Sequence, residues 1–234
     1  MQLFYNSDLK PNEKYFCFDK NESRHIVKVL RKNIGDKLHI TNGLGSIFEA
    51  EILSNNPNKC EVSITTTTTV PNKKYSIHLA VAPTKMNDRY EWFLEKATEI
   101  GVDQITPIIC ARSERKIIKL ERYEKIIHAA AKQSLRAYFP ILNPAVYFAD
   151  FIKNTTESER YIAHCLTQNL PHLKDVILPK KNILILIGPE GDFNSDEIQL
   201  AKGLDFEAVS LGNTRLRTET AALVACHITE LCNA

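Results

Sequence analysis

The sequence predicts an α/β domain that follows a smaller, β-rich N-terminal domain. Residues 183–187, which read Ile-Leu-Ile-Leu-Ile, are continuously apolar, as is typical of a strand buried on both faces of a parallel sheet. Residues 75–109 combine a strand that Pro83 ends, a helical stripe from Met86 to Ile100 that stops at Gly101, and a second strand at 104–109. This order of strand, helix and strand predicts a βαβ unit.

The N-terminal part shows a different periodicity. Residues 37–40 and 47–52 alternate in the manner of strands, and the segment 41–46 between them, Thr-Asn-Gly-Leu-Gly-Ser, predicts a hairpin turn. Five threonines at 65–69 precede Val-Pro-Asn-Lys-Lys and end the apolar pattern, although threonine also favours extended backbone and could prolong a strand. We therefore expect a first domain at residues 1–70 and a second at residues 75–234.

Composition narrows the class of protein. The chain has 234 residues and a formal net charge of only +2, so a nucleic-acid surface must be a local patch. Its six cysteines include no C-x-x-C pair and follow no secretory leader, which favours reduced cytoplasmic thiols over disulfides or zinc. No apolar run reaches the length that a membrane-spanning helix needs. We expect a cytoplasmic protein with no metal and no membrane partner.

Two glycine loops near the end of the chain predict the functional site. Gly188-Pro189-Glu190-Gly191 follows the strand at 183–187, and Gly212 follows a strand at 206–211. Ligands of open α/β sheets bind beyond the carboxyl ends of the strands, so two neighbouring strand ends indicate one pocket. The loops match neither a phosphate-binding P-loop nor the dinucleotide fingerprint. Taken alone, the first loop is also compatible with a plain strand–helix turn.

Taken together, the two loops closely resemble those of the SPOUT superfamily of knotted methyltransferases. Within it, they resemble the family that methylates N3 of a uridine in 16S ribosomal RNA. That family has Gly-Pro-Glu-Gly-Gly after one strand and Leu-Gly-x-x-x-Leu-Arg-Thr-Glu-Thr-Ala after another. The matching positions here are 188–191, Leu211, Gly212 and 216–221, whereas Asp192 replaces a glycine and Asn213-Thr214-Arg215 replaces Pro-Arg-Ile or Pro-Arg-Val. Shorter matches at Lys85, 96–102 and 133–136 extend the resemblance over most of the chain.

The resemblance implies both a fold and an activity. The implied fold is α/β, with a trefoil-knotted SPOUT-type methyltransferase domain preceded by a small PUA-like β-barrel that binds RNA. His25, Val29-Leu30-Arg31 and Gly35-Asp36 follow the order of the start of that PUA-like domain. The implied reaction is methyl transfer from S-adenosylmethionine to N3 of a specific uridine in 16S ribosomal RNA of the small ribosomal subunit. The implied assembly is a homodimer.

Candidate site residues follow from these matches. The expected cofactor-binding residues are His164, Cys165, Leu166, Ile187, Gly188, Pro189, Glu190, Gly191, Leu211, Gly212, Leu216, Thr218 and Ala221. Arg217 is the expected catalytic cation, because N3 of uracil must lose a proton and a nearby cation stabilises the resulting anion. Glu219 is a second catalytic candidate, as the base or as the group that orients Arg217. A structural ion pair at the start of the last helix is the alternative for both.

Expected RNA contacts are basic residues near strand ends and on one predicted helix. They are Arg24, Lys28, Arg31, Lys85, Arg112, Arg115 and Arg136. Phosphate contacts of this kind supply affinity and position the RNA without reading its sequence. In the stretch 23–32 we expect a helix with the apolar positions 26, 29 and 30 on one face and the basic residues elsewhere. The alternative is that these charges only solvate the surface.

Two other functions compete with a methyltransferase. A non-catalytic RNA-binding or ribosome-assembly factor with the same fold would not require both loop motifs, so their presence favours the enzyme. A hydrolase that uses Cys165 and His164 is disfavoured, because neighbouring residues of a strand point to opposite faces.

The last helix carries one apolar face, made of Leu216, Thr220, Leu223, Val224, His227, Ile228 and Leu231.

Overall fold

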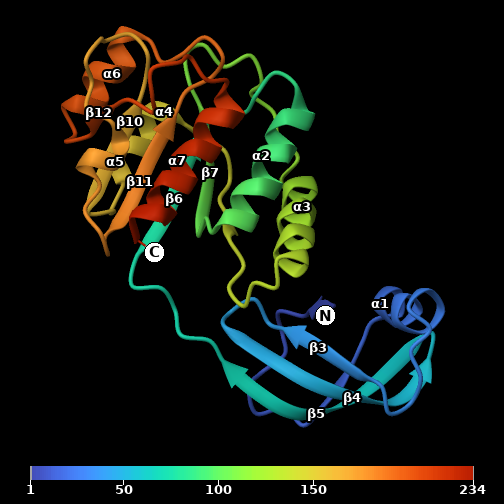
Figure 1. Ribbon diagram of the computed structural model, residues 1–234. Helices are drawn as coiled ribbons and strands as arrows, with labels where there is room; N and C mark the ends of the chain where they lie inside the picture. Colours follow the sequence, from blue (N-terminus) through green and yellow to red (C-terminus); the bar gives the residue numbers. More distant parts are fainter. Residues whose placement is uncertain (1, 234) are drawn as a thin grey trace. The chain divides into compact units, whose positions relative to one another are not determined.

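The computed structural model describes residues 2–233, which form two compact units (Figure 1). The first unit runs from the N-terminal end to Asn72 and also includes Ala131–Phe139. The second comprises Lys73–Ala130 and the chain from Pro140 onward. None of the helices in the described part of the chain is long and apolar enough to cross a membrane.

The first unit is built on a five-stranded sheet in the order β1-β3-β4-β5-β2. Its elements are β1 (Leu3–Tyr5), β2 (Tyr15–Cys17), α1 (Lys20–Arg24), η1 (His25–Val29), β3 (Lys37–Thr41), β4 (Ser46–Asn56) and β5 (Lys59–Thr69). The predicted hairpin between β3 and β4 is confirmed, with Thr41 opposite Ile47. The five threonines prolong β5, and the last four, 66–69, pair with the start of β4, because β-branched side chains suit a pleated surface.

A segment distant in sequence completes the first unit. Residues 131–139 reach its hairpin turn, where Gly45 N–H donates to the carbonyl of Ala137 at 2.9 Å. The Tyr138 hydroxyl donates to the carbonyl of Val70 at 2.9 Å. The ring of Phe139 stacks on Tyr5 with centroids 4.4 Å apart. The residues after Gln133 in the family-like Gln-Ser-x-Arg stretch therefore belong to the first unit, which periodicity along the chain does not reveal.

The predicted helix at 23–32 is only partly right. Residues Lys20–Arg24 are α-helical, but His25–Val29 form a π-helical turn in which Leu30 N–H reaches back to the carbonyl of His25. A π-turn takes more residues than an α-turn, so it rotates later side chains off the α-helical face. Ile26 is fully buried as expected, whereas Val29 is 69% exposed. Val29 therefore does not share the face of Ile26, contrary to the expectation of one apolar face at 26, 29 and 30.

The second unit is an α/β sandwich around a parallel sheet with strand order β12-β10-β11-β6-β7-β8 and β9 beside β7. Its strands are β6 (Ser76–Val81), β7 (Gln104–Ile109), β8 (Ile141–Leu142), β9 (Val146–Tyr147), β10 (Glu159–Ala163), β11 (Asn182–Ile187) and β12 (Glu207–Val209). Its helices are α2 (Asn87–Ile100), α3 (Leu120–Gln133), α4 (Phe148–Phe151), η2 (Ile152–Asn154), α5 (Leu173–Val176), α6 (Ser195–Lys202) and α7 (Thr218–Asn233).

Alternate side chains of the central strands enter two separate cores. Ile183, Ile185 and Ile187 of β11 pack with α2, α3, α5 and α7, whereas Leu184 and Leu186 pack with α4 and α6 on the opposite face. This two-sided burial explains why β11 is an unbroken apolar run. Parallel β6, α2 and parallel β7 confirm the predicted βαβ unit.

The buried face of α7 differs from the expected one. The helix packs closely on α2 and β6 through small residues, Ala222, Ala225, Cys226 and Thr229, all of which are fully buried. Small side chains let two helix backbones approach closely, so the tight contact selects this face. Leu231 from the expected apolar face is 66% exposed, and Val224 is only half-buried. Leu223 and Ile228 pack at the edge of the core, and Leu231 lies at the surface of the unit.

A buried polar network joins the middle of the sheet. The Nδ1 atom of His78 lies 2.5 Å from Oε1 of Glu157, and its Nε2 atom lies 2.7 Å from the Thr106 hydroxyl. Burial alone would raise the pKa of Glu157. The hydrogen bonds and charge of His78, and the backbone N–H groups of Glu157 and Thr156, outweigh burial and lower it.

We expect Glu157→Gln to lower the free energy of unfolding by about 1–3 kcal/mol at neutral pH, since a buried hydrogen bond to a charged group is lost. Because the pKa of Glu157 is lowered in the folded state, its stabilisation is complete above the ordinary value of 4.5. The stabilisation is lost as the pH falls through the folded-state pKa. Urea unfolding should therefore show a smaller difference between the two proteins under acidic conditions.

The matched control is Glu124→Gln, which neutralises an exposed carboxylate of α3. Its free energy of unfolding should stay close to that of the wild type, as is usual for surface changes. An equal loss of stability in both variants at every pH would contradict the role assigned to the His78–Glu157 pair.

Candidate cofactor and RNA site

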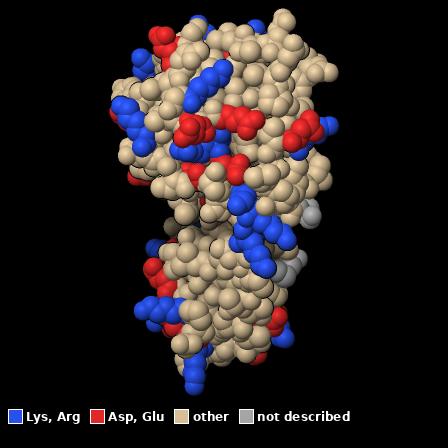
Figure 2. Space-filling model, turned by 90° about the vertical axis from the view of Figure 1, so that its left-hand side faces the viewer, with Lys and Arg blue, Asp and Glu red and all other residues tan. Residues whose placement is uncertain are grey.

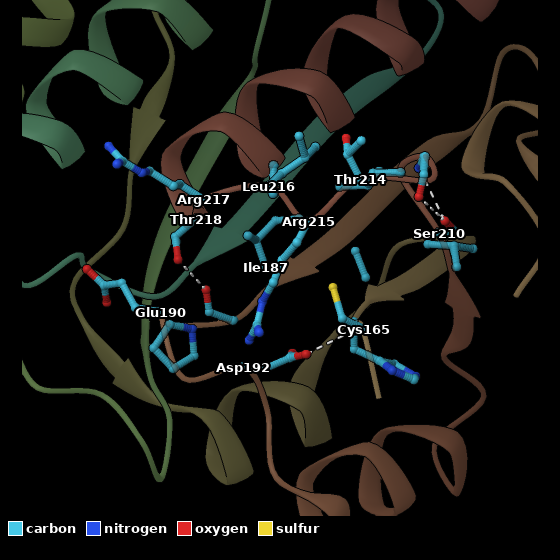
Figure 3. A pocket seen from close by; sticks show the side chains of 18 residues that line it. Cys165, Ile187, Glu190, Asp192, Ser210, Thr214, Arg215, Leu216, Arg217 and Thr218 are labelled. Atoms are coloured by element: carbon cyan, nitrogen blue, oxygen red, sulfur yellow. Dashed lines mark hydrogen bonds between the residues drawn. The ribbon is translucent and has the colours of Figure 1, made fainter. Parts of the chain in front are cut away.

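A pocket of about 310 Å³ lies beyond the carboxyl ends of β10, β11 and β12 (Figure 3). Parallel pairing brings these ends together, with Ala163 of β10 opposite both Ile187 of β11 and Val209 of β12. The predicted residues that line the pocket are His164, Cys165, Ile187, Gly188, Pro189, Glu190, Leu211, Gly212, Leu216, Arg217, Thr218 and Ala221. The two glycine loops thus form one concave site.

Some expected residues lie outside the pocket wall. Leu166 is 53% exposed and does not line the pocket. Gly191 also lies outside it and packs against the side chain of Arg112. Glu219 is buried behind the wall at the start of α7.

Other lining residues were missed by the sequence reasoning. They are Ala163, Asp192, Val209, Ser210, Thr214 and Arg215. Asp192, Thr214 and Arg215 are positions at which the chain departs from the family pattern, so the pattern assigns them no role. A charged residue in a glycine loop is nevertheless a visible signal in the sequence.

The first loop is held tightly against its own strand. A Cβ atom at Gly188 would lie 3.1 Å from both the backbone nitrogen and the ring of Phe193, so the turn leaves little space for a side chain. The Thr218 hydroxyl of α7 donates to the carbonyl of Gly188 at 3.1 Å (Figure 3). After the loop, Asn194 and Glu197 form a capping box at the start of α6.

The second loop, at Gly212, has free space around its backbone, whereas the first loop, at Gly188, is closely packed. Gly212 has φ +138°, a conformation that side-chain-bearing residues rarely adopt. A Cβ atom at this position would meet nothing within 4 Å, so the backbone faces free space. A substitution at Gly212 would therefore strain the loop without a steric clash.

His164 presents an unused donor at the edge of β10. Its Nδ1 atom accepts a hydrogen bond from Leu166 N–H at 3.3 Å, which places the proton of the neutral ring on Nε2. Nε2 is buried and has no partner within the described residues. Burial lowers the pKa of His164; Lys202 lowers it further, whereas the Asp192 carboxylate opposes the shift. The ring is therefore neutral near pH 7, and its Nε2–H is a buried donor without a partner among the described residues.

The two catalytic candidates occupy different environments. Arg217 is exposed, and Figure 3 shows its side chain extending from the pocket rim away from the interior. The Glu219 carboxylate is buried, with Oε1 3.9 Å from Nε of Arg89 and Oε2 without a hydrogen-bond partner in the described chain. The cation nearest to Glu219 is thus Arg89, whereas Arg217 makes no side-chain bond to a described residue.

Three loops at this edge of the sheet are joined by hydrogen bonds. Arg112 donates to the carbonyl of Gly191 at 2.7 Å, and Arg115 donates to the carbonyls of Thr84 and Lys85 at 3.1 and 2.9 Å. The N–H of Lys85 donates in turn to Glu190 at 2.9 Å. The loops that follow β6, β7 and β11 therefore support one another.

The side chains expected to contact RNA in the second unit are partly engaged within the protein. Arg112 and Arg115 each use part of their donor set within the protein, and the Lys85 ammonium lies 2.8 Å from the Glu114 carboxylate. A guanidinium has five N–H donors, so both arginines keep donors for a ligand. Figure 2 shows Lys and Arg side chains interleaved with Asp and Glu over one face of this unit, in keeping with a low net charge.

The basic residues of the first unit are freer. Arg24, Lys28 and Arg31 are exposed, and no side-chain hydrogen bond or ion pair joins them to another described residue. Arg31 adopts φ +55° directly after the π-helical turn. Arg136 is half-buried in the same unit and has partners of its own.

No group of three or more His, Cys, Asp or Glu side chains among residues 2–233 is arranged to hold a metal ion. Cys165 is exposed, and its N–H donates to the Asp192 carboxylate at 2.9 Å. This contact makes the start of the loop after β10 part of the pocket wall.

Comparisons with known proteins agree with this architecture. Residues 71–230 match the family model of the RNA methyltransferase domain, and residues 18–65 match that of the RNA methyltransferase PUA domain. Among similar sequences, the ribosomal RNA small subunit methyltransferase E of Rickettsia conorii is 30% identical over 226 residues, covering 96% of this chain and 92% of its own. The protein of the same name from Buchnera aphidicola subsp. Acyrthosiphon pisum is 32% identical over 233 residues, covering 96% and 90%.

Solved structures extend the similarity to three dimensions. A probable rRNA-methyltransferase from Porphyromonas gingivalis has a TM-score of 0.91 and 39% identity, covering 99% of both chains. The ribosomal RNA small subunit methyltransferase E from Neisseria gonorrhoeae, bound to S-adenosyl methionine, has a TM-score of 0.85 and 29% identity, covering 97% of this chain and 95% of that one. With a PUA domain, an α/β methyltransferase domain and relatives that match over nearly their full length, the chain belongs to the RNA methyltransferase family that includes the ribosomal RNA small subunit methyltransferases E.

Proposed function

We propose that this protein transfers a methyl group from S-adenosylmethionine to N3 of a uridine in 16S ribosomal RNA of the small ribosomal subunit. The pocket at the ends of β10, β11 and β12 carries this proposal, because it combines the two family-like loops in one concave site. The R. conorii relative is named a small-subunit ribosomal RNA methyltransferase, and the N. gonorrhoeae relative binds S-adenosyl methionine. Both properties are consistent with the chemistry of this site.

The pocket fits an adenosyl-methionine ligand in three respects. Leu211, Leu216 and Ala221 supply apolar walls, and His164 supplies a buried Nε2–H donor without a partner in the described chain. Gly212 leaves its backbone open to free space. Pockets of this kind bind a ligand through apolar area and orient it with a few polar groups. When bound, the cofactor supplies an activated methyl group on a sulfonium.

The remaining chemistry falls to the protein. N3 of uracil is a weakly acidic imide and becomes nucleophilic when it loses its proton. We assign Arg217 to stabilise the developing anion, because it is a permanent cation at the rim, where a base arriving from outside would meet it. Glu219 is the weaker candidate, since its carboxylate is buried beside Arg89 and outside the pocket.

Two further proposals, on assembly and location, are based on the family resemblance. We propose a homodimer in which the outer apolar side chains of α7, including Leu231, are covered by a second copy. We further propose a cytoplasmic protein whose methyltransferase domain is a trefoil knot; of the domains expected at residues 1–70 and 75–234, the second gives up residues 131–139 to the first unit. The return of α7 to pack on α2 and β6, after leaving the pocket, is compatible with that path.

The first test is cofactor binding. We expect isothermal titration calorimetry to detect S-adenosylmethionine binding to the wild type, and Gly212→Val to abolish it. Valine is disfavoured at φ +138°, so the loop must move and the pocket wall is lost. Circular dichroism should show a folded variant. Unchanged affinity in a folded variant would place the pocket elsewhere.

Cofactor binding without methylation of small subunits would favour the non-catalytic assembly factor.

The second test addresses Arg217. We expect Arg217→Ala to lower the single-turnover rate of methyl transfer by about 10²–10³, the range for loss of one charge-stabilising group. Cofactor affinity should change much less, because the interaction strengthens only as charge develops on the base. Rates are measured with small ribosomal subunits and the product is identified as N3-methyluridine by mass spectrometry.

Arg217→Lys is the matched control. It keeps the charge and loses the planar guanidinium, so it should recover only part of the rate. A wild-type rate in Arg217→Ala would instead assign this residue to surface solvation.

The third test addresses RNA affinity. We expect the triple change of Arg24, Lys28 and Arg31 to Gln to weaken binding to 16S ribosomal RNA fragments. If each side chain neutralises one phosphate, the slope of log affinity against log salt should become shallower by about 2–3. Affinity is measured by fluorescence anisotropy at several salt concentrations.

A control variant removes three other exposed charges of the same unit, at Lys10, Lys14 and Lys59. The overall charge change is identical, but these side chains lie outside the predicted helix. Equal slopes for both triple variants would show that only net charge matters and would contradict a specific RNA surface at residues 24–31.

A further inference from the structure

Two charged residues that the sequence pattern did not assign line the same pocket. Asp192 comes from the loop after β11, and Arg215 comes from the loop before α7. Both stand where the chain departs from the resembled family, which has a glycine at the first position and isoleucine or valine at the second. A carboxylate and a guanidinium therefore replace two uncharged residues within one site.

Asp192 is held rigidly in the pocket wall. Its Oδ2 accepts the N–H of Cys165 at 2.9 Å, and its Oδ1 accepts the N–H of Phe193 at 2.8 Å. A carboxylate offers about four lone-pair positions, so each oxygen keeps acceptor capacity after these bonds. The left-handed backbone of Asp192, with φ +63°, places this anion where a glycine would leave only backbone.

Arg215 is the unpaired counterpart. It is exposed, and no hydrogen bond or ion pair ties its guanidinium to any residue in the described part of the chain. Figure 3 shows its side chain pointing into the pocket, toward the loop that carries Asp192, whereas Arg217 points away. The two charges thus face one cavity without forming a salt bridge to each other.

The other charged or titratable side chains that line the pocket are less well placed for a ligand inside it, and Arg217, although unpaired, points away from the interior. Glu190 accepts the N–H of Lys85 at 2.9 Å, and Figure 3 shows it at the margin of the pocket. His164 is neutral near pH 7. Asp192 and Arg215 are therefore an anion and a cation that face the interior of the pocket and are not paired with each other.

We propose that Asp192 and Arg215 bind the amino-acid end of the cofactor, Asp192 its α-ammonium and Arg215 its α-carboxylate. This inference rests on the proposed function, because it presupposes that the pocket takes S-adenosylmethionine. The methionine half of that molecule is a zwitterion, whose two opposite charges match a carboxylate and a guanidinium that are not already paired. Adenine and ribose are uncharged and use neither. A guanidinium also matches a carboxylate with two parallel hydrogen bonds.

The test compares ligands that differ at this end. S-adenosylmethionine and S-adenosylhomocysteine both carry the zwitterion, whereas 5′-methylthioadenosine lacks it. We expect Arg215→Gln and Asp192→Gly each to weaken calorimetric binding of the first two by about tenfold, the size of one charged hydrogen bond. Binding of 5′-methylthioadenosine should be unchanged. Glycine tolerates the left-handed backbone at position 192, so the loop can keep its path.

The control is Lys181→Gln, which removes an exposed cation beside the start of β11, at the opposite end of that strand. It should alter none of the three affinities. Equal affinities in the wild type and both pocket variants would overturn this inference alone. So would an equal loss for 5′-methylthioadenosine, or a loss of RNA methylation with unchanged S-adenosylhomocysteine affinity. Failure of the wild type to bind any of the three ligands would instead refute the proposed function.

Discussion

The parallel pairing of β10 with β11 and β12 is the constraint on which the site depends. It places Ala163 opposite both Ile187 and Val209, so the three strands end at the same level of the sheet. The loops that follow them therefore meet around one pocket. A shift of β10 by one residue would reverse which of its side chains face each core. The alternation between the two cores makes such a shift costly, because buried isoleucines and leucines of β11 would meet mismatched partners.

The rim of the pocket depends on a second set of interactions. Arg112 and Arg115 hold the loops after β6, β7 and β11 through backbone carbonyls. Each such bond contributes on the order of 1 kcal/mol, and together they tie the exposed parts of the three loops to one another. The same arginines keep donors toward solvent. Each of the two arginines thus both supports the loops and is a candidate for phosphate binding. Truncating either side chain would affect both roles.

Periodicity along the chain predicted the elements better than their contacts. The βαβ unit and the hairpin between β3 and β4 depend on neighbours in sequence, and both predictions were correct. The buried face of α7 was not, because close packing on α2 selected its small residues over its larger apolar ones. The position of Val29 was also predicted wrongly, but for a local reason. A π-helical turn does not show in a helical wheel drawn for an α-helix.

The sequence by itself determined the fold class, the order of its elements, the family and most of the pocket residues, because unbroken apolar strands and two long loop motifs are properties of contiguous segments. Only the tertiary structure decided which side chains share the pocket and which face one another. It brought Asp192 and Arg215 into one cavity, turned Arg217 to the rim, and attached residues 131–139 to the first unit. These relations join residues far apart in the chain, so they follow from strand register and loop path rather than from any local pattern.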